Sequence, residues 1–357
     1  MINQNSEFLF AFEAVMTNPN GDPDQENKPR MDYDTKTALV SDARRKRDCR
    51  EFFKRKGYPI FVDTIEEQKV PADVMFDHIV RKWMNDDGKF ANLLNSRSAL
   101  QEKWNELSAS VKEKDSYYGI YSEIRDNSKK GEAKKHFSRF NNELITAIIQ
   151  EELIDVRLFG SAMAVENVTR TFTGPVQISW AYSLHPVELV KSNTITSIMN
   201  EDNSTFGKKH KLYYGLFMHC GTINKYAAKL TGMTHRDQEL FRKALVQGLM
   251  QNQTDSKQGQ TPLFYLEIQY TPDFDGFIGD MRKYVDVTYD ENKPIRSLRD
   301  LNVSLNDLEH VIEDMKKRGY ISKVIGWHHP LGDYKNVFNF AVDEFVDLWQ
   351  PVTEVYA

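Results

Sequence analysis

The sequence predicts an α+β fold built around an antiparallel β-sheet. Residues 7–15, "EFLFAFEAV", place Phe8, Phe10 and Phe12 on one side with a period of two, which is typical of a strand. Outside a helical segment at about residues 61–150, the expected elements follow in the order strand, helix, strand, strand, helix, strand. This is the order of the split βαβ, ferredoxin-like unit, whose antiparallel sheet is also the frame of RRM domains. Many metabolic and regulatory domains share the order, so it does not assign a function by itself.

Two amphipathic helices belong to this unit. The first is expected at residues 39–57, where Ser41 or Asp42 can cap the start and Gly57 can end the helix. The second is expected at residues 234–252, "THRDQELFRKALVQGLMQN". Its inward side chains are expected to be Leu240, Phe241, Ala244, Leu245 and Leu249.

The other strands of the unit lie in the second half of the chain. Residues 169–184, 211–223 and 262–271 are rich in aromatic and β-branched residues and are expected to be strands. The tail has an acidic balance and holds at least one more helix, at residues 305–319. By contrast, residues 61–150 show helical periodicity with polar stretches between, which predicts a helical insertion with Trp83 and Trp104 in its core.

Composition limits the classes of protein that are plausible. The chain has 357 residues, of which 40% are hydrophobic and 28% charged, as in an ordinary globular protein of one large or two smaller domains. The net charge of −5 predicts that any anion-binding surface is local. Cys49 and Cys220 form no CxxC pattern, so neither a disulfide framework nor a thiolate zinc site is expected. With neither a signal peptide nor a run of about 18 apolar residues, the prediction is a cytoplasmic protein without a membrane contact.

A polar segment, "TNPNGDPDQENKPR" at residues 17–30, follows the first strand. Asn18, Asn20, Asp22 and Asp24 alternate as in a calcium loop, but a loop with glycine at position six would end on an asparagine in place of the bidentate glutamate. We therefore expect either a rigid turn or a preorganised arm that contacts a ligand or a neighbouring subunit. The nearby basic residues Lys28 and Arg30 favour an anionic ligand.

The helix at residues 39–57 carries a basic ridge. Arg47, Arg50 and Lys54 fall on one stripe, which is either a solvated face with acidic partners or a surface for a phosphate backbone. Arg44 and Lys46 flank the stripe. The opposite, buried face is expected to hold Cys49, Phe52 and Phe53. Ser41 and the free amides of the first turn also favour phosphate.

Two further segments carry basic side chains. "GKKHK" at residues 207–211 ends a long polar stretch, and Lys208, Lys209 and His210 beside Phe206 suit a grip on a nucleic-acid backbone or an exposed mobile loop. "DSKQGQTP" at residues 255–262 is either an ordinary turn or a sheet edge from which Ser256, Lys257 and Gln260 reach phosphates.

Signs of catalysis are few. The sequence has no Walker motif, HExxH, GxSxG or GxGxxG, and the adjacent His328 and His329 are expected to be structural. Four loop acids could take part in RNA cleavage, although no spacing singles out an acid–base pair. They are Asp22, Asp24, Asp32 and Asp34. We expect no metal, no cofactor and no enzymatic activity.

Several of these segments together resemble a known family. They are "NPNGDPDQENKPRMD", "LVSDARRKRDCREF", "DVRLFG" (155–160), "FTGPVQISWAYSLHPV" (172–187) and "SKQGQTP". In combination they are similar to the repeating backbone subunit of type I CRISPR Cascade complexes, a member of the RAMP superfamily, with the type I-B branch fitting best and type I-C close by. The resemblance covers most of residues 7–275 and is weaker in the helical insertion and in the acidic tail.

The resemblance implies a fold and a set of partners. An RRM-like palm would comprise residues 1–60 and 151–357, with helical fingers at 61–150, a thumb at about 188–211 and a C-terminal extension from about 272. Copies would polymerise along the CRISPR guide RNA, join other Cascade subunits and present the guide to target DNA. Because guide sequences vary, such a carrier should contact backbone and shape. The residues expected to bind RNA are Asn20, Lys28, Arg30, Ser41, Arg44, Lys46, Arg47, Arg50, Lys208, Lys209, His210, Ser256 and Lys257.

One residue departs from the family pattern, and two alternatives remain. Arg45 stands where an apolar residue is expected, so we predict that it snorkels or pairs across an interface. The first alternative is a metal-dependent RNA endonuclease, since related type III subunits cut RNA with an aspartate after the first strand, and Asp24, Asp32 or Asp34 could serve here. The second alternative is a ferredoxin-like domain that binds a small molecule.

Overall fold

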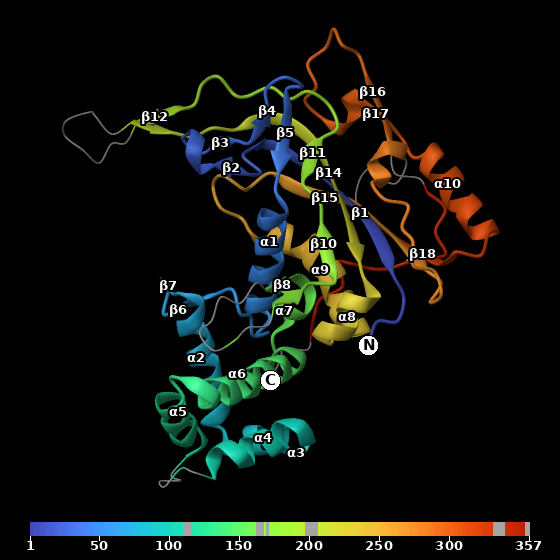
Figure 1. The fold of residues 1–357 in the computed structure, drawn as a ribbon. Coiled ribbons are helices and arrows are strands. Elements are labelled where there is room, and N and C mark those ends of the chain that lie inside the picture. The colour runs from blue at the N-terminus through green and yellow to red at the C-terminus, as the bar shows by residue number, and fades with distance from the viewer. Residues whose placement is uncertain are drawn as a thin grey trace. The chain divides into compact units, whose positions relative to one another are not determined.

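The computed structural model describes residues 1–109, 111, 116–161, 168, 171–196, 206–330 and 340–353 (Figure 1). The chain forms two compact units. Unit 1 contains residues 1–56, 176–225 and 234–357, and unit 2 contains residues 57–175 and 226–233.

Unit 1 is built on a nine-stranded sheet. The strand order is β19-β18-β15-β1-β14-β11-β5-β4, and β10 also pairs with β14. All pairings are antiparallel except that of β18 with β19. The strands are β1 (Ser6–Thr17), β4 (Met31–Asp32), β5 (Thr37–Val40), β10 (Val176–Ile178), β11 (Ala181–Ser183), β14 (Leu212–Ile223), β15 (Gln260–Tyr270), β18 (Ile321–His328) and β19 (Glu344–Phe345).

The centre of this sheet has the predicted topology. β1, the first predicted strand in the chain, lies between β14, which is the third, and β15, which is the fourth. The second predicted strand corresponds to β10 and β11, which pair with the other side of β14. This is the ferredoxin-like arrangement, so the predicted fold class is confirmed. The structure adds β4 and β5 at one edge and β18 and β19 at the other. The single strand expected at 169–184 is wrong, since its described part forms β9 (Phe172–Thr173), β10 and β11, and residues 169–170 lie outside the described residues.

Two helices cover one face of the sheet. They are α1 (Asp42–Arg55) and α9 (His235–Gln251), and the phenylalanines of β1 point toward them, with Phe8 and Phe241 in edge contact at 5.4 Å between centroids. Ser41, one of the two residues expected to cap α1, does so, and Thr234 caps α9. The helices approach closely at Gly248, where a Cβ atom would lie 2.8 Å from the backbone oxygen of Asp48.

The opposite face of the sheet is covered by the C-terminal segment (Figure 1). Its elements are η2 (Met281–Tyr284), β16 (Asp286–Tyr289), η3 (Leu298–Asp300), β17 (Leu301–Ser304) and α10 (Asn306–Lys317). Leu308 and Ile312 of α10 belong to the same buried cluster as Leu9 and Ala11 of β1. RRM domains bind RNA on an open sheet face, whereas the part of this sheet beneath the C-terminal elements is covered.

Unit 2 is mostly helical. Its elements are β6 (Thr64–Ile65), β7 (Gln68–Lys69), α2 (Ala72–Met84), α3 (Asp87–Asn95), α4 (Ser98–Ser108), α5 (Tyr117–Asn127), α6 (Gly131–Glu151), α7 (Ile154–Phe159), β8 (Gly160–Ser161), β9, and α8 (Lys225–Thr231) from its second residue on. The prediction that Trp83 and Trp104 lie in its core is confirmed, because both are buried in one cluster. Within the described ranges, no helix is long and apolar enough to cross a membrane.

Candidate nucleic-acid interface

The arm, residues 17–30, is a compact hairpin braced by its own side chains. It contains β2 (Gly21–Asp22), η1 (Pro23–Gln25) and β3 (Lys28–Pro29). Asn18 Nδ2 donates to the Asn27 carbonyl at 2.7 Å, and Asp22 Oδ1 accepts from the Asp24 amide at 3.2 Å. Asp22 and Asp24 therefore take part in turn formation. Arg30 is paired with Asp22 at 3.5 Å.

The Asn20 side chain ties the arm to the start of helix α1. Asn20 Oδ1 accepts hydrogen bonds from the Ser41 amide at 2.8 Å and from the Ser41 hydroxyl at 2.9 Å. The Ser41 hydroxyl in turn accepts from the Arg44 amide at 3.2 Å and caps the helix. Both Asn20 and Ser41 are buried, so their contribution to RNA binding would come from the shape that they impose on the arm and on the helix start.

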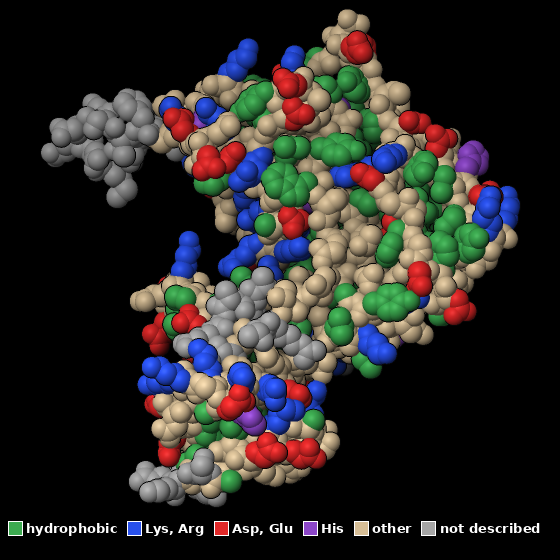
Figure 2. Space-filling model, in the orientation of Figure 1, with side chains coloured by type: hydrophobic (Ala, Val, Ile, Leu, Met, Phe, Trp, Pro, Cys, Tyr) green, Lys and Arg blue, Asp and Glu red, His purple; other side chains and the backbone are tan. Residues whose placement is uncertain are grey.

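Helix α1 has the predicted buried and basic faces. Cys49, Phe52 and Phe53 are fully buried, which confirms the assignment of the core face. Three of the basic side chains are paired with acidic ones one turn away: Arg44 with Asp48, Lys46 with Asp42 and Arg47 with Glu51. Figure 2 shows Lys and Arg side chains gathered over the region of α1, with acidic side chains among them. The ridge is therefore basic but partly neutralised.

Arg45 does not snorkel, contrary to expectation. Its guanidinium is fully buried, with Nη1 3.0 Å from Asp48 Oδ2 and Cζ 4.8 Å from the centroid of the Phe12 ring. Burial lowers the pKa of Arg45, and the charge of Asp48 opposes that effect. Asp48 also accepts a hydrogen bond from Asn252 at 2.6 Å. Arg45 thus belongs to the core between α1 and the sheet.

The loop after α9, residues 252–259, supports the base of the arm. The Ser256 carbonyl accepts from the Thr17 hydroxyl at 2.6 Å and from the Asn18 amide at 2.9 Å. Lys257 Nζ donates to the Asn18 carbonyl at 2.6 Å. Burial, followed by the nearby charge of Arg44, lowers the pKa of Lys257 to about 8. Lys257 therefore lies close to Arg44, whose acidic partner is Asp48.

The base of the predicted thumb joins the same end of unit 1. It is a short hairpin of β12 (Thr194–Thr196) and β13 (Phe206–Lys208), and residues 197–205 and the Phe206 side chain lie outside the described residues. Lys208 Nζ lies 3.4 Å from a Glu26 oxygen in the arm, and Lys209 Nζ lies 2.6 Å from an Asp255 oxygen in the loop after α9. The His210 ring is hydrogen-bonded to Asn193 at 3.0 Å.

The predicted residues thus come from four segments that meet. The arm contacts α1 through Asn20, the loop after α9 through Asn18, and the thumb base through Glu26. Lys46, Arg47 and Arg50 continue from this junction along α1. Sequence reasoning missed Glu26 and Asp255 as partners of the thumb lysines, because residues so distant in sequence leave no local signal.

The loop acids show no catalytic grouping. Asp32 Oδ1 accepts from the Asp34 amide at 3.0 Å, and hydrogen bonds from Thr35 and Asp34 lower the pKa of Asp32. Asp24 and Asp34 are exposed. In the part of the chain that the structure describes, no three His, Cys, Asp or Glu side chains gather in a way that could hold a metal ion.

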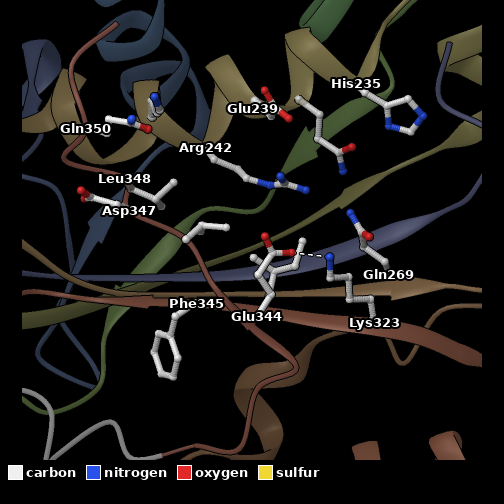
Figure 3. Close-up of a pocket in the computed structure, with 14 residues that line it drawn as sticks. His235, Glu239, Arg242, Gln269, Lys323, Glu344, Phe345, Asp347, Leu348 and Gln350 are labelled. Carbon is white, nitrogen blue, oxygen red and sulfur yellow. Dashed lines mark ion pairs between the residues drawn. The ribbon is translucent and has the colours of Figure 1, made fainter.

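A polar pocket lies elsewhere in unit 1, between α9, β18 and the tail (Figure 3). Its volume is about 630 Å³, and it contains none of the predicted RNA-binding residues. Figure 3 shows Arg242 opposite the ion pair of Glu344 with Lys323. Arg242 is held by the buried carboxylate of Glu267 at 2.7 and 2.9 Å. The pocket has the size of a small-molecule site, but its lining mixes charges of both signs and lacks the apolar walls typical of such sites.

The chain is similar to proteins of one family. The model of the family described as "CRISPR-associated protein Cas7" matches residues 4–306. "CRISPR-associated protein Cas7" of Haloferax volcanii is 24% identical over 345 residues, which cover 90% of this chain and 86% of that protein. A solved chain of a "CRISPR RNA-guided surveillance complex, pre-nicking" shares the fold with a TM-score of 0.51 at 14% identity, over 96% of both chains. The match over most of the length identifies this chain as a member of the Cas7 family of CRISPR-associated proteins.

Proposed function

We propose that this chain is an RNA-binding backbone subunit of a type I CRISPR surveillance complex, in the type I-B branch. Copies polymerise along the guide RNA, join other subunits and present the guide for pairing with target DNA. Unit 1 then serves as the palm, residues 61–150 as fingers and about 188–211 as the thumb. The complex acts in the cytoplasm. Membership of the Cas7 family and the fold shared with a chain of an RNA-guided surveillance complex support these assignments.

One observation carries the proposal. The arm, the start of α1, the loop after α9 and the thumb base meet at one end of unit 1, and each brings at least one basic side chain to the junction. Positive charge spread over several elements suits a phosphate backbone, which carries charge at every nucleotide. Contacts to the backbone suit a protein that must accept any guide sequence.

The direct test is binding of the purified protein to two guide-length RNAs of unrelated sequence, over a range of salt concentrations. The expected result is equal affinity for both, with log K falling linearly as log salt rises. A strong preference for one sequence, or affinity that ignores salt, would contradict backbone recognition.

We also propose that the subunit is not a nuclease. The support is that Asp22 and Asp32 accept hydrogen bonds from backbone amides of their own turns. The test is incubation of the assembled complex with complementary RNA and Mg²⁺ or Mn²⁺, beside an Asp34→Ala variant. No cleavage by either protein is expected. Cleavage by the native protein that the variant loses would establish the endonuclease alternative.

A further inference from the structure

An exposed tryptophan lies beside the arm. The Trp180 side chain is 45% exposed, whereas Trp83, Trp104 and Trp327 are at most 5% exposed. Trp180 stands between β10 and β11 in the main sheet. The large ring of a tryptophan would gain from burial against a partner, so Trp180 is a candidate for a contact that the isolated chain does not make.

The backbone at Trp180 is irregular. Ile178 pairs with Gly221, and Tyr182 pairs with Met218. The four residue steps from Ile178 to Tyr182 therefore lie opposite only three steps of β14, from Gly221 to Met218. The segment between Ile178 and Tyr182 therefore contains a one-residue bulge. Bulges reorient a side chain at a chosen point of a sheet, and they occur often beside binding sites.

An arginine from the C-terminal segment holds this bulge in place. Arg282 Nη1 donates to the Trp180 carbonyl at 2.6 Å, and its Cζ lies 4.4 Å from the centroid of the Tyr182 ring. Asp280 binds the same guanidinium through two hydrogen bonds of 2.8 and 2.7 Å. These contacts raise the pKa of Arg282 against the opposing effect of burial, so the group stays charged.

The ring of Trp180 belongs to the same region as the arm and the start of α1. Arg30 of the arm lies with its Cζ 5.9 Å from the Trp180 ring centroid, and its side chain is 29% exposed. Ala181 pairs with Val40, which directly precedes the Ser41 cap of α1. An aromatic face, a guanidinium and a helix start therefore lie next to one another.

We propose that Trp180 is a stacking platform for a nucleobase of the bound single-stranded RNA, with Arg30 placed to contact an adjacent phosphate. The inference rests on the proposed RNA-binding function and assigns a base contact to a chain whose other predicted contacts are to the backbone. Every base has a π-face, so stacking adds affinity without selecting a sequence. The surroundings of Trp180 are charged: Arg30 lies over the ring and pairs with Asp22, and the Trp180 carbonyl accepts from Arg282, which pairs with Asp280. A cation beside an aromatic ring suits a nucleotide better than an apolar protein surface.

The test compares two RNAs of equal length and charge, one with bases and one with abasic residues throughout. Trp180→Ala should weaken binding of the RNA with bases by about 5- to 150-fold for one stacked base per subunit, and leave binding of the abasic RNA unchanged. Trp180→Phe should retain most of the affinity. Phe345→Ala is the matched control, since Phe345 is 61% exposed and β19 lies five strands, or about 24 Å, from β11 in the sheet.

Each other outcome overturns the inference. An equal loss on both RNAs would indicate a structural role or a contact with a neighbouring copy, and no loss on either would exclude stacking. If the native protein binds neither RNA, the proposed function itself fails, which is a distinguishable result. Because the Phe variant keeps a ring in the bulge, it tests stacking even where the Ala variant folds poorly.

Arg282 acts as a positioning residue in this scheme. Arg282→Ala should reproduce the base-dependent loss of Trp180→Ala, and Arg282→Lys should restore part of it because a lysine can still donate to the Trp180 carbonyl. Photo-crosslinking with 5-iodouridine RNA gives an independent measurement. The native protein should yield a crosslinked peptide that contains Trp180, and Arg282→Ala should lose that crosslink. A crosslink that persists in Arg282→Ala would remove the positioning role.

Discussion

Asn20 Oδ1 accepts two hydrogen bonds from Ser41, at 2.8 Å from the amide and 2.9 Å from the hydroxyl. Both residues are buried, and the Ser41 hydroxyl also caps α1. The position of the arm is thereby coupled to the first turn of the helix that carries the basic ridge. We therefore predict that Asn20 affects RNA binding through the position of the arm, without contacting RNA itself.

Asn20→Ala should destabilise the protein and weaken RNA binding together. The variant leaves the Ser41 amide without its acceptor, which costs about 1–3 kcal/mol, and releases the arm. Asn20→Asp keeps the acceptor for Ser41 but loses the Nδ2 donor to the Gly21 carbonyl, so it should lose less stability than Asn20→Ala. Its added negative charge should still reduce RNA affinity. Equal affinity in Asn20→Asp and the native protein would show that no phosphate approaches this junction.

Neutralising Arg47 and Arg50 should reduce the salt dependence of RNA binding. For single-stranded RNA each lost phosphate contact lowers the slope of log K against log salt by about 0.7, so the double Gln variant should lose about 1.4. Lys317→Gln with Arg318→Gln at the end of α10 is the control, since it removes the same number of positive charges elsewhere in unit 1, where the two residues pair with Glu313 and Asp314. An unchanged slope in the α1 variant would mean that the ridge is solvated surface.

RNA affinity should fall between pH 7 and pH 9 because of Lys257. Its pKa is lowered to about 8 by burial and by Arg44, so the free protein loses this charge within that range. Bound phosphate favours the charged form, and binding should therefore take up a proton. Burial raises the pKa of Cys49 to about 12 and that of Cys220 to about 11, so neither thiol titrates in this window.

Lys257→Arg stays charged, so its RNA affinity should change little between pH 7 and pH 9. Lys257→Met has no charge to lose and should bind RNA weakly at both pH values. The stability of the free native protein should behave in the opposite way and rise with pH above about 8, since the unfolded chain then binds more protons than the folded one. A pH profile that is the same in the native protein and Lys257→Arg would exclude Lys257 as the titrating group.

Removal of Asp48 should cost much more unfolding free energy than removal of Arg45. Asp48→Ala leaves the buried Arg45 charge uncompensated and should cost about 3–5 kcal/mol in the free energy of unfolding. Arg45→Met should be neutral within about 1 kcal/mol, because Asp48 keeps Arg44 and Asn252 as partners. In the Arg45→Met background, Asp48→Ala should cost much less. Additive losses in the double variant would show that the two charges are not coupled.

The sequence predicts those features that depend on local periodicity. The phenylalanines of β1, the buried face of α1 and the Ser41 cap of α1 all follow from patterns within a few residues, and the structure contains each of them. The bulge at Trp180 and the contact of Lys257 with Asn18 do not follow from spacing. The bulge depends on the register of β10 and β11 against β14. The contact of Lys257 with Asn18 joins residues 239 positions apart, which only the folded chain brings together.

The same limit applies to the sheet face. The element order correctly predicts the central strands, but it also suggests an RRM surface that α10 and its neighbours cover. The spacing of Leu308 and Ile312 predicts an apolar helix face, but it does not indicate which surface that face packs against. The site residues themselves stay predictions, which the RNA measurements above decide.

The most direct measurement of the central claim is to purify the protein with its native partner subunits and to sequence the RNA that accompanies it. We predict short RNAs of uniform length that carry a repeat-derived handle joined to variable guide sequences. Heterogeneous cellular RNA would contradict the guide-specific role, and the absence of RNA from a folded, co-expressed preparation would contradict RNA binding altogether.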